Sequence, residues 1–259
     1  TKLFPQGSSS NGLDRRPIAR VIFTPDSTVA RDPLFAQVLD RRSNKDPFDM
    51  SRTIDPAALV RIGAVVANGS RFGGTVAPHE VATWRELTHR ALQIEIETPR
   101  TFQESIDLFR IGHREVDANP DGIDFTGPLF EALHLSGQFT RASAADPTST
   151  AYQAGLDAVF ANTDTAMGHV WLVTAGNSRA DQIATGADWL RVNLAVTSEG
   201  LGFQPLSQAL QEFPEMADPY TTVHKRLAPT GGTVQMLSRI GFGPTTIASP
   251  RWPLETRIA

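Results

Sequence analysis

The chain of 259 residues contains no cysteine. It can therefore form neither disulfides nor thiolate metal sites, and it has no cysteine nucleophile. No apolar run approaches the ~18 residues that would span a membrane. The formal net charge of −4 gives no reason to expect a nucleic-acid partner, which a basic face would indicate. With 40% hydrophobic and 20% charged residues, the composition is that of a globular protein with a sizeable core.

Motifs of several enzyme classes are also missing. The sequence has no G-x-S-x-G nucleophile turn and no G-x-x-x-x-G-K-[ST] phosphate loop. Its six histidines are scattered, and His79 and His89 lack the i, i+4 spacing of a zinc-binding helix. Nucleophilic hydrolysis, nucleotide binding by a phosphate loop and a helical zinc site are therefore poorly supported.

The first 31 residues differ in composition from the rest. They contain Gly, Ser, Pro and charged residues around one apolar stretch, Ile18 to Phe23, which favours an edge strand within a linker. We therefore expect an N-terminal extension over residues 1–31 and one domain over residues 32–259. Because the chain starts at Thr1 rather than Met, we expect that something upstream was removed. A cytoplasmic protein is favoured, or an exported one if a signal peptide was removed.

Helix signals recur through the middle of the chain. Asp-Pro pairs at 32–33 and 55–56 are typical helix starts, since Asp caps the helix and Pro fits its first turn. The sequence Thr101-Phe-Gln-Glu104 predicts a capping box for another helix. Apolar spacing predicts further helices over residues 78–92, 128–135 and 151–160, and a long one ending near residue 200. The long helix is expected to bury a stripe consisting of Ile183, Ala187, Leu190 and Leu194.

Strand signals are fewer. His169–Thr174 and Val234–Ile240 have the apolar, β-branched composition of buried strands. Residues 200–208 are predicted to be a loop, and the Asn119-Pro-Asp-Gly122 turn predicts an exposed excursion over residues 112–124. Because strands and helices do not alternate regularly, we predict an α+β fold with helices packed on a small mixed or antiparallel sheet.

Three separated elements are suited to holding an anion. The first is Arg41, Arg42 and Ser43, in the stretch LDRRSNKDPF, because guanidinium groups pair bidentately with phosphate and a hydroxyl adds a donor. The second is Arg251, which flanking prolines place on a stiff extended tail. The third is the loop at 200–208, whose backbone amides can donate to a ligand.

Together these elements resemble the FMN-dependent nitroreductase superfamily, most closely its Acg-type branch. The matching stretches occur in the family's order, at Arg41–Asp49, His169–Gly176, Ser198–Gln208 and Gly241–Glu255. The resemblance covers about residues 32–255 and implies a nitroreductase-like FMN-binding fold. It also implies FMN as the cofactor, with NAD(P)H as its reductant.

The resemblance implies roles for five basic or hydroxyl residues. Arg41 and Ser43 would hold the FMN phosphate and ribityl chain, with Arg42 beside them. Lys45 would lie near the pyrimidine edge of the flavin. Arg251 would be the phosphate ligand from the C-terminal tail, although the family often has a second basic residue where this chain has a tryptophan.

The resemblance also implies a role for the segment Pro205-Leu206-Ser207-Gln208. The backbone amides of Ser207 and Gln208 would face flavin N5 and O4, where donors stabilise the reduced ring. No side-chain acid or base is needed for hydride transfer to the flavin, so no catalytic residue is predicted.

The function that follows is an oxidoreductase that passes a hydride from NAD(P)H to FMN and on to an electron-poor small molecule, a nitroaromatic or a quinone. The alternative is a non-catalytic, Acg-type protein that binds or sequesters FMN under a lid, for which Arg110–Pro128 is the candidate. A structural domain without flavin is a third possibility. Acg-type chains usually carry an earlier half that is missing here, so we expect a homodimer or pairing with such a half.

Overall fold

The computed structural model describes residues 1–9, 12 and 14–258. Its centre is an antiparallel sheet of four strands in the order β3-β6-β8-β7. The strands are β3 (Arg71–Thr75), β6 (Gly168–Thr174), β7 (Gly202–Pro205) and β8 (Thr233–Gly241). The central pair, β6 and β8, is the pair that the sequence predicts. Neither edge strand was expected, and the loop predicted over residues 200–208 is wrong where β7 pairs with β8.

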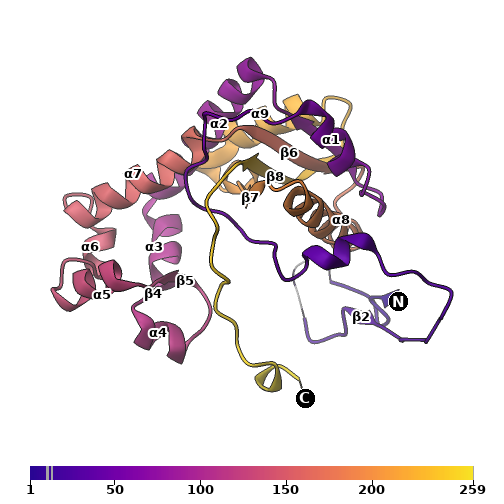
Figure 1. Ribbon diagram of the computed structural model, residues 1–259, viewed down its shortest axis with the longest axis horizontal. Helices are drawn as coiled ribbons and strands as arrows, with labels where there is room; N and C mark the ends of the chain where they lie inside the picture. The colour runs from indigo at the N-terminus through magenta and orange to yellow at the C-terminus, as the bar shows by residue number, and fades with distance from the viewer. Residues whose placement is uncertain (10–11, 13, 259) are drawn as a thin grey trace.

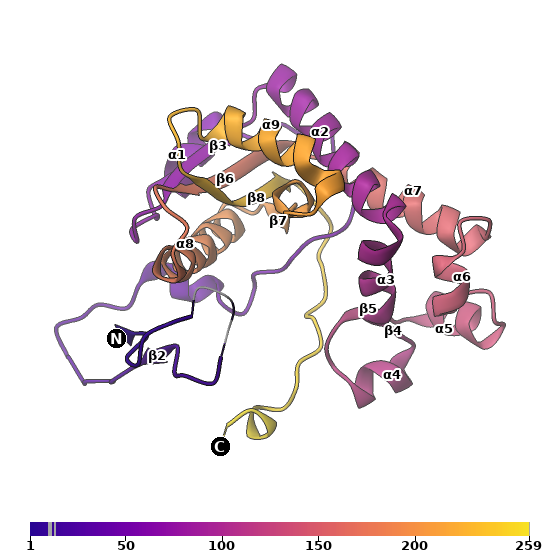
Figure 2. The same ribbon diagram turned by 180° about the vertical axis from the view of Figure 1, so that it is seen from behind.

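Helices cover both faces of the sheet, which gives three layers (Figures 1 and 2). Helices α1 (Pro56–Gly63) and α8 (Arg179–Ser198) pack on one face, and α2 (Pro78–Glu97) and α9 (Ala217–Leu227) pack on the other. Side chains of β6 alternate between the two cores, with Leu172 on the first and Val173 on the second. The predicted α+β class is confirmed.

Local capping explains most helix starts. Asp55 accepts a hydrogen bond from the Ala57 amide at 2.9 Å, with Pro56 in the first turn of α1. Asp32 caps the 3₁₀ helix η1 (Pro33–Gln37) in the same way. The capping box predicted at Thr101 is wrong: α3 begins at Pro99, and the Thr101 hydroxyl lies inside the helix, where it donates to the Glu95 carbonyl.

The buried face of α8 also differs from the predicted stripe. Leu194 is buried as predicted, but Leu190 is 45% exposed and Ala187 is exposed, whereas the polar Thr185 and Asp188 are buried. Asp188 is fully buried because it binds the loop between α1 and β3. Its carboxylate accepts hydrogen bonds from the amides of Ala67 (2.9 Å), Asn68 (2.9 Å) and Ser70 (3.2 Å) and from the Asn68 side chain (2.8 Å). Burial raises the pKa of Asp188, but these hydrogen bonds outweigh it and lower the pKa overall.

Residues 99–164 form a side lobe that extends away from the sheet (Figure 1). It contains a two-stranded parallel sheet and five helices: β4 (Phe109–Ile111), β5 (Ile123–Phe125), α3 (Pro99–Asp107), α4 (His113–Ala118), α5 (Pro128–Leu135), α6 (Arg141–Ala145) and α7 (Thr150–Asp164). The expected excursion over residues 112–124 lies in this lobe and contains α4 and the start of β5. Helix α5 has the bounds that the sequence predicts.

The two ends of the chain are extended and lie at the lower end of the molecule in Figure 1. Strand β1 (Lys2–Leu3) pairs with β2 (Ala19–Arg20), so the strand expected over residues 18–23 is reduced to two residues. After β8, a tail runs away from the sheet and ends in the 3₁₀ helix η4 (Leu254–Thr256). The other 3₁₀ helices are η2 (Gln208–Leu210) and η3 (Pro214–Met216). Across the described residues, no helix combines the length and apolarity needed to cross a membrane.

Candidate functional site

The segment of residues 41–49 lies between β7 and the start of the tail. The Asn44 amide donates to the Phe203 carbonyl at 2.9 Å, and the Asn44 side chain donates to the Pro244 carbonyl at 2.8 Å. The glycines at 241 and 243 permit this close approach. A Cβ atom at Gly241 would lie 2.2 Å from the Phe48 ring, and one at Gly243 would lie 2.5 Å from the Asn44 side chain.

A buried arginine lies beneath this segment. Arg239 of β8 is 0% exposed and donates to the carbonyls of Asn44 (3.2 Å) and Asp46 (2.7 Å). It also donates to the side chain of Gln204 on β7 at 2.5 Å, and its guanidinium stacks on the Phe48 ring at 3.9 Å. Burial lowers the pKa of Arg239 to about 9. Arg239 thus joins the segment of residues 41–49 to β7, although its Nη1 has no partner among the described residues.

Three of the predicted site residues on this segment have polar side chains that remain available. Within the described part of the chain, the side chains of Arg41, Ser43 and Lys45 have no hydrogen-bond or ion-pair partner. Ser43 and Lys45 are exposed, and Arg41 is half-buried. Two cations and a hydroxyl therefore face solvent from one short, tethered segment, which suits an anionic group.

Arg42 is used differently. Its guanidinium donates to the Leu39 carbonyl at 2.7 Å, the Arg41 carbonyl at 2.8 Å and the Thr246 carbonyl at 3.2 Å. These contacts join the segment to the tail. The structure therefore gives Arg42 a structural task beside the ligand contact that the sequence suggests.

The predicted segment Pro205–Gln208 directly follows the pairing of β7 with β8. Pro205 pairs with Ser238, and the buried Leu206 donates its amide to the Leu237 carbonyl at 2.9 Å. The next two amides, those of Ser207 and Gln208, have no acceptor among the described residues. They are the two amides to which the resemblance assigns a ligand contact, and the Asn44–Phe203 bond joins their strand to the segment of residues 41–49.

Arg251 lies apart from these residues. Its guanidinium makes one hydrogen bond within the described chain, to the Pro250 carbonyl at 2.8 Å. The neighbouring Trp252 donates its indole N–H to Asp121 in the side lobe at 3.2 Å. The structure thus joins the segment of residues 41–49 to β7, the strand that leads into residues 205–208, by one backbone hydrogen bond, and it leaves Arg251 on the tail.

Sequence reasoning missed Arg239 and Gln204. An arginine inside the apolar run Val234–Ile240 was the available signal, because a charged residue in a central strand is buried only where its donors are satisfied.

His169 of β6 is a second buried titratable residue of the sheet. It is 0% exposed, neither ring nitrogen has a partner among the described residues, and burial lowers its pKa to about 3. The described residues contain no cluster of three or more His, Asp or Glu side chains suited to a metal ion.

No protein-family model and no curated protein matches the chain. The solved structures that share its architecture include two point mutants of the FMN and NADPH-dependent nitroreductase NfnB from Sphigopyxis sp. strain HMH. The first is 16% identical, with a TM-score of 0.51, and the second is 18% identical, with a TM-score of 0.50. Each alignment covers 87% of this chain and 97% of the other. At this identity the likeness shows the fold alone, and the fold is nitroreductase-like.

Proposed function

We propose that this protein is an FMN-binding oxidoreductase of nitroreductase type. The observation that carries the proposal is a set of donors on neighbouring segments that have no partner among the described residues. The side chains of Arg41, Ser43 and Lys45 lie on the segment that the Asn44–Phe203 hydrogen bond joins to β7, and the amides of Ser207 and Gln208 lie on the segment that follows β7. FMN is an anionic, acceptor-rich molecule, so it fits this donor set better than a cationic or apolar ligand would.

Each residue has a binding or orienting role in this proposal. Arg41 and Ser43 bind the phosphate and ribityl chain, and Lys45 binds the pyrimidine edge of the flavin. The two free amides, those of Ser207 and Gln208, donate to flavin N5 and O4. Arg251, on the C-terminal tail, adds a further contact to the phosphate.

FMN, when bound, supplies the ring that accepts a hydride from NAD(P)H and reduces an electron-poor acceptor such as a nitroaromatic or a quinone. The protein contributes position and electrostatics. Arg239 holds the carbonyls of Asn44 and Asp46, so the Lys45 backbone between them is held in place. No side chain is assigned as a proton donor or acceptor.

A second function is favoured by one contact. The bond between Trp252 and Asp121 joins the tail to the turn that lies within the candidate lid, Arg110–Pro128. A lid tied to the tail suits a protein that holds or sequesters FMN without turnover, as in the Acg-type branch. Membership of that branch is part of this second proposal.

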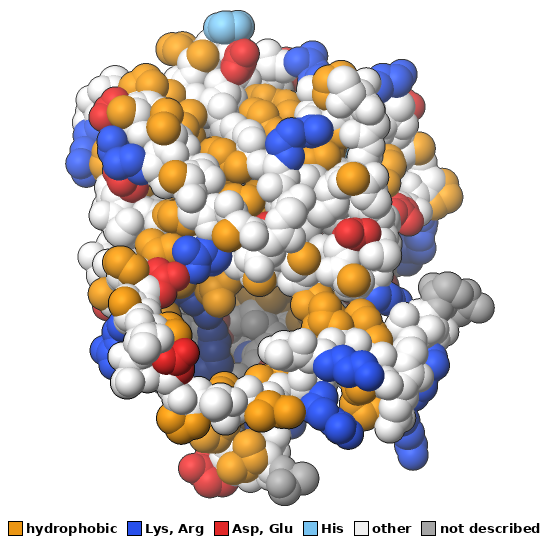
Figure 3. Space-filling view, turned by 90° about the vertical axis from the view of Figure 1, so that its right-hand side faces the viewer, with side chains coloured by type: hydrophobic (Ala, Val, Ile, Leu, Met, Phe, Trp, Pro, Cys, Tyr) orange, Lys and Arg blue, Asp and Glu red, His pale blue; other side chains and the backbone are white. Residues whose placement is uncertain are grey.

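We also propose that a second copy of the chain, or a separate N-terminal half, completes the site. Residues 18–39 and the C-terminal tail carry large apolar side chains that face solvent, including Phe23 (91% exposed), Leu39 (83%) and Ile247 (74%). Figure 3 shows hydrophobic side chains around a hollow at the lower end of the molecule, where these segments lie. Exposed apolar groups of this kind mark an interaction surface. The division into an extension, residues 1–31, and a domain from residue 32 is part of the same proposal.

The absorption spectrum of the purified protein, before and after anaerobic addition of NADPH, tests the main proposal. Flavin bands that disappear on addition support the oxidoreductase, and bands that persist support the sequestering protein. A protein that remains colourless after incubation with FMN would contradict both.

Substitution of Arg41 tests the site itself. Arg41→Ala is expected to weaken FMN binding about 10- to 100-fold, because a charged hydrogen bond to phosphate contributes ~1.5–3 kcal/mol. The matched control is Arg71→Ala. Arg71 is an exposed arginine of β3, the edge strand farthest from β7 in the sheet. If Arg41→Ala and Arg71→Ala lose equal affinity for FMN in a fluorescence titration, Arg41 is not a phosphate ligand.

A further inference from the structure

The side lobe contains a cavity of about 440 Å³ that is separate from the candidate site described above. We call it the aromatic pocket; its walls come from the end of α2, from α3, β4, β5, α5, α6 and α7, and from the loops beside them. We propose that the aromatic pocket binds an uncharged, fused two-ring aromatic molecule. No residue of the 41–49 segment, the 205–208 segment or the tail lines it.

The chemistry of the lining selects an uncharged ligand. Eighteen residues line the pocket, and none of them is Asp, Glu, Lys, Arg or His. A charged ligand would leave water without gaining a partner there, which is strongly unfavourable. The few polar groups, from Gln138, Thr150 and Tyr152, suit a ligand with one hydroxyl or carbonyl.

The rings in the wall select a flat ligand. Phe125 lies at the centre of an aromatic cluster, with its ring centroid 4.6 Å from that of Phe109, 5.0 Å from Phe139 and 5.2 Å from Phe130. These rings meet at tilted or edge-on angles, the arrangement in which aromatic groups attract one another. All four rings are only partly buried, so a flat aromatic molecule would cover apolar surface that the lobe leaves incompletely packed.

The volume of the aromatic pocket restricts the class of ligand further. A cavity of about 150 Å³ lined by apolar side chains accommodates one benzene molecule. The aromatic pocket, at about 440 Å³, is large enough for a fused two-ring molecule with a small substituent.

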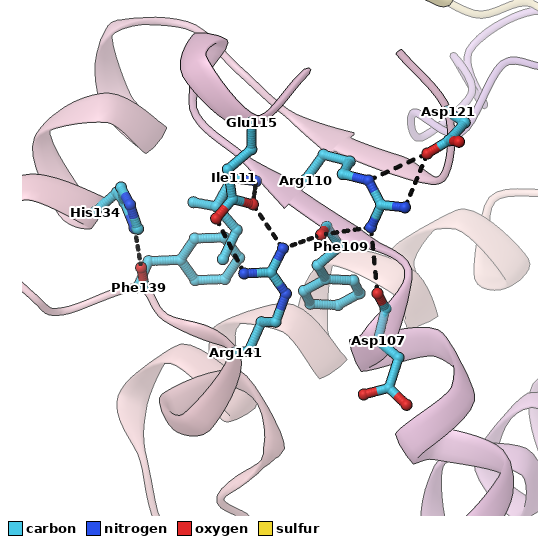
Figure 4. Close-up of polar contacts among 9 residues, drawn as sticks. All are labelled: Asp107, Phe109, Arg110, Ile111, Glu115, Asp121, His134, Phe139 and Arg141. Carbon is cyan, nitrogen blue, oxygen red and sulfur yellow. Dashed lines mark hydrogen bonds and ion pairs between the residues drawn. The ribbon is translucent and has the colours of Figure 1, made fainter. Parts of the chain in front are cut away.

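A polar network in the lobe holds the backbones of two of these phenylalanines in place (Figure 4). Arg141 pairs with both oxygens of Glu115, at 3.0 and 2.6 Å, and donates to the Phe109 carbonyl at 2.5 Å. This hydrogen bond with Arg141 keeps the pKa of Glu115 below its usual value. His134 contacts the Phe139 carbonyl at 3.2 Å, so its Nδ1 carries the proton in that bond. The backbones of Phe109 and Phe139 are thus anchored before any ligand arrives, which lowers the entropic cost of binding.

Gly155 on α7 offers a direct test. It lines the pocket, and a Cβ atom placed on it would meet no heavy atom within 4 Å. A larger side chain at this position can therefore occupy the pocket without displacing the chain. Gly186 on α8 is the matched control, since it is also an exposed helical glycine with nothing within 4 Å, and it does not line the pocket.

The experiment is isothermal titration calorimetry of the full chain with 2-naphthol, an uncharged two-ring alcohol. Saturable binding with one site per chain is expected, and Gly155→Leu should weaken it at least about tenfold. Gly186→Leu should bind as the unmodified chain does. 2-Naphthoate, which adds a carboxylate to the same rings, should bind at least about tenfold more weakly than 2-naphthol.

Three results would overturn the proposal. The first is that 2-naphthol does not bind, and the second is that Gly155→Leu binds it as tightly as the unmodified chain does. The third is that the chain binds 2-naphthoate as tightly as 2-naphthol. A change of oligomeric state in Gly155→Leu, measured by light scattering, would assign the pocket to a contact between copies instead. The flavin spectrum of each variant is recorded in parallel, so failure here is distinguishable from failure of the proposed FMN site.

Discussion

Asp188→Asn is the most direct test of how the α1–β3 loop is held. The carboxylate is fully buried and accepts from four donors on three residues: the amides of Ala67, Asn68 and Ser70 and the Asn68 side chain. A carboxylate only accepts hydrogen bonds, whereas an asparagine has one accepting oxygen and an NH₂ group that only donates. The substitution keeps the shape of the side chain but places its NH₂ group against an N–H donor of the loop.

The magnitude follows from these contacts. If the asparagine oxygen replaces Oδ1, the bonds from Ala67, the Asn68 amide and the Asn68 side chain survive but become neutral, each losing ~0.5–1 kcal/mol. The Ser70 amide, bonded to Oδ2 at 3.2 Å, then faces an NH₂ group and stays buried without an acceptor, which costs about 1–3 kcal/mol. The free energy of unfolding should therefore fall by about 2.5–6 kcal/mol, or on the order of 10 °C in melting temperature.

The effect should also depend on pH. Because the pKa of Asp188 is lower in the folded chain than in the unfolded chain, its contribution is fully present above the unfolded value of about 3.9 and is lost as the pH falls below that value. Urea unfolding at pH 7 and at steps down to pH 3 measures both predictions. The control is Asp181→Asn, a partly exposed cap residue of the same helix that accepts from the Ser178 amide. A loss below about 1 kcal/mol at pH 7, or one that does not shrink in acid, would refute the reasoning.

Two further substitutions test buried groups of the sheet. His169→Leu should stabilise the protein by about 1 kcal/mol at pH 7, because both ring nitrogens lack partners among the described residues. With a folded pKa of about 3, His169 stays neutral when the unfolded chain gains a proton, so stability should fall by about 1.4 kcal/mol per pH unit below about pH 6.5. Urea unfolding should show that the variant lacks this slope; an unchanged slope would contradict the assignment. Arg239→Met should change the free energy of unfolding by less than about 2 kcal/mol, since the lost hydrogen bonds are offset by removing a buried cation. It should nevertheless weaken FMN binding about tenfold by releasing Asn44 and Asp46; unchanged affinity in a fluorescence titration would exclude a positioning role.

Several features of the fold could be predicted from local sequence. Asp-Pro pairs gave the starts of η1 and α1, and the apolar composition of residues 169–174 and 234–240 gave the central strands. The errors arose where polar residues are buried. The stripe predicted on α8 left out Asp188, because a single sequence gives no sign that a distant loop will bring this carboxylate four donors. The edge strand β3 was missed because its Phe-Gly-Gly sequence is not strand-like; a Cβ atom at Gly73 would lie 2.3 Å from the Trp171 indole of the neighbouring strand.

The candidate site divides in the same way. The donor chemistry of Arg41 and Ser43 and the resemblance to the nitroreductase superfamily were enough to select Arg41, Ser43, Lys45 and the segment 205–208, since a motif can be matched without knowing the contacts around it. Which of those donors remains free is decided by contacts between distant parts of the chain. Asn44 pairs with Phe203, Arg42 is engaged by Thr246, and Arg239 holds the segment from below. The sequence by itself determined the chemical types available and the local starts and stops of the backbone. Only the tertiary structure decided which polar groups are satisfied inside the protein and which are left for a ligand, because hydrogen-bond pairing depends on separation in space.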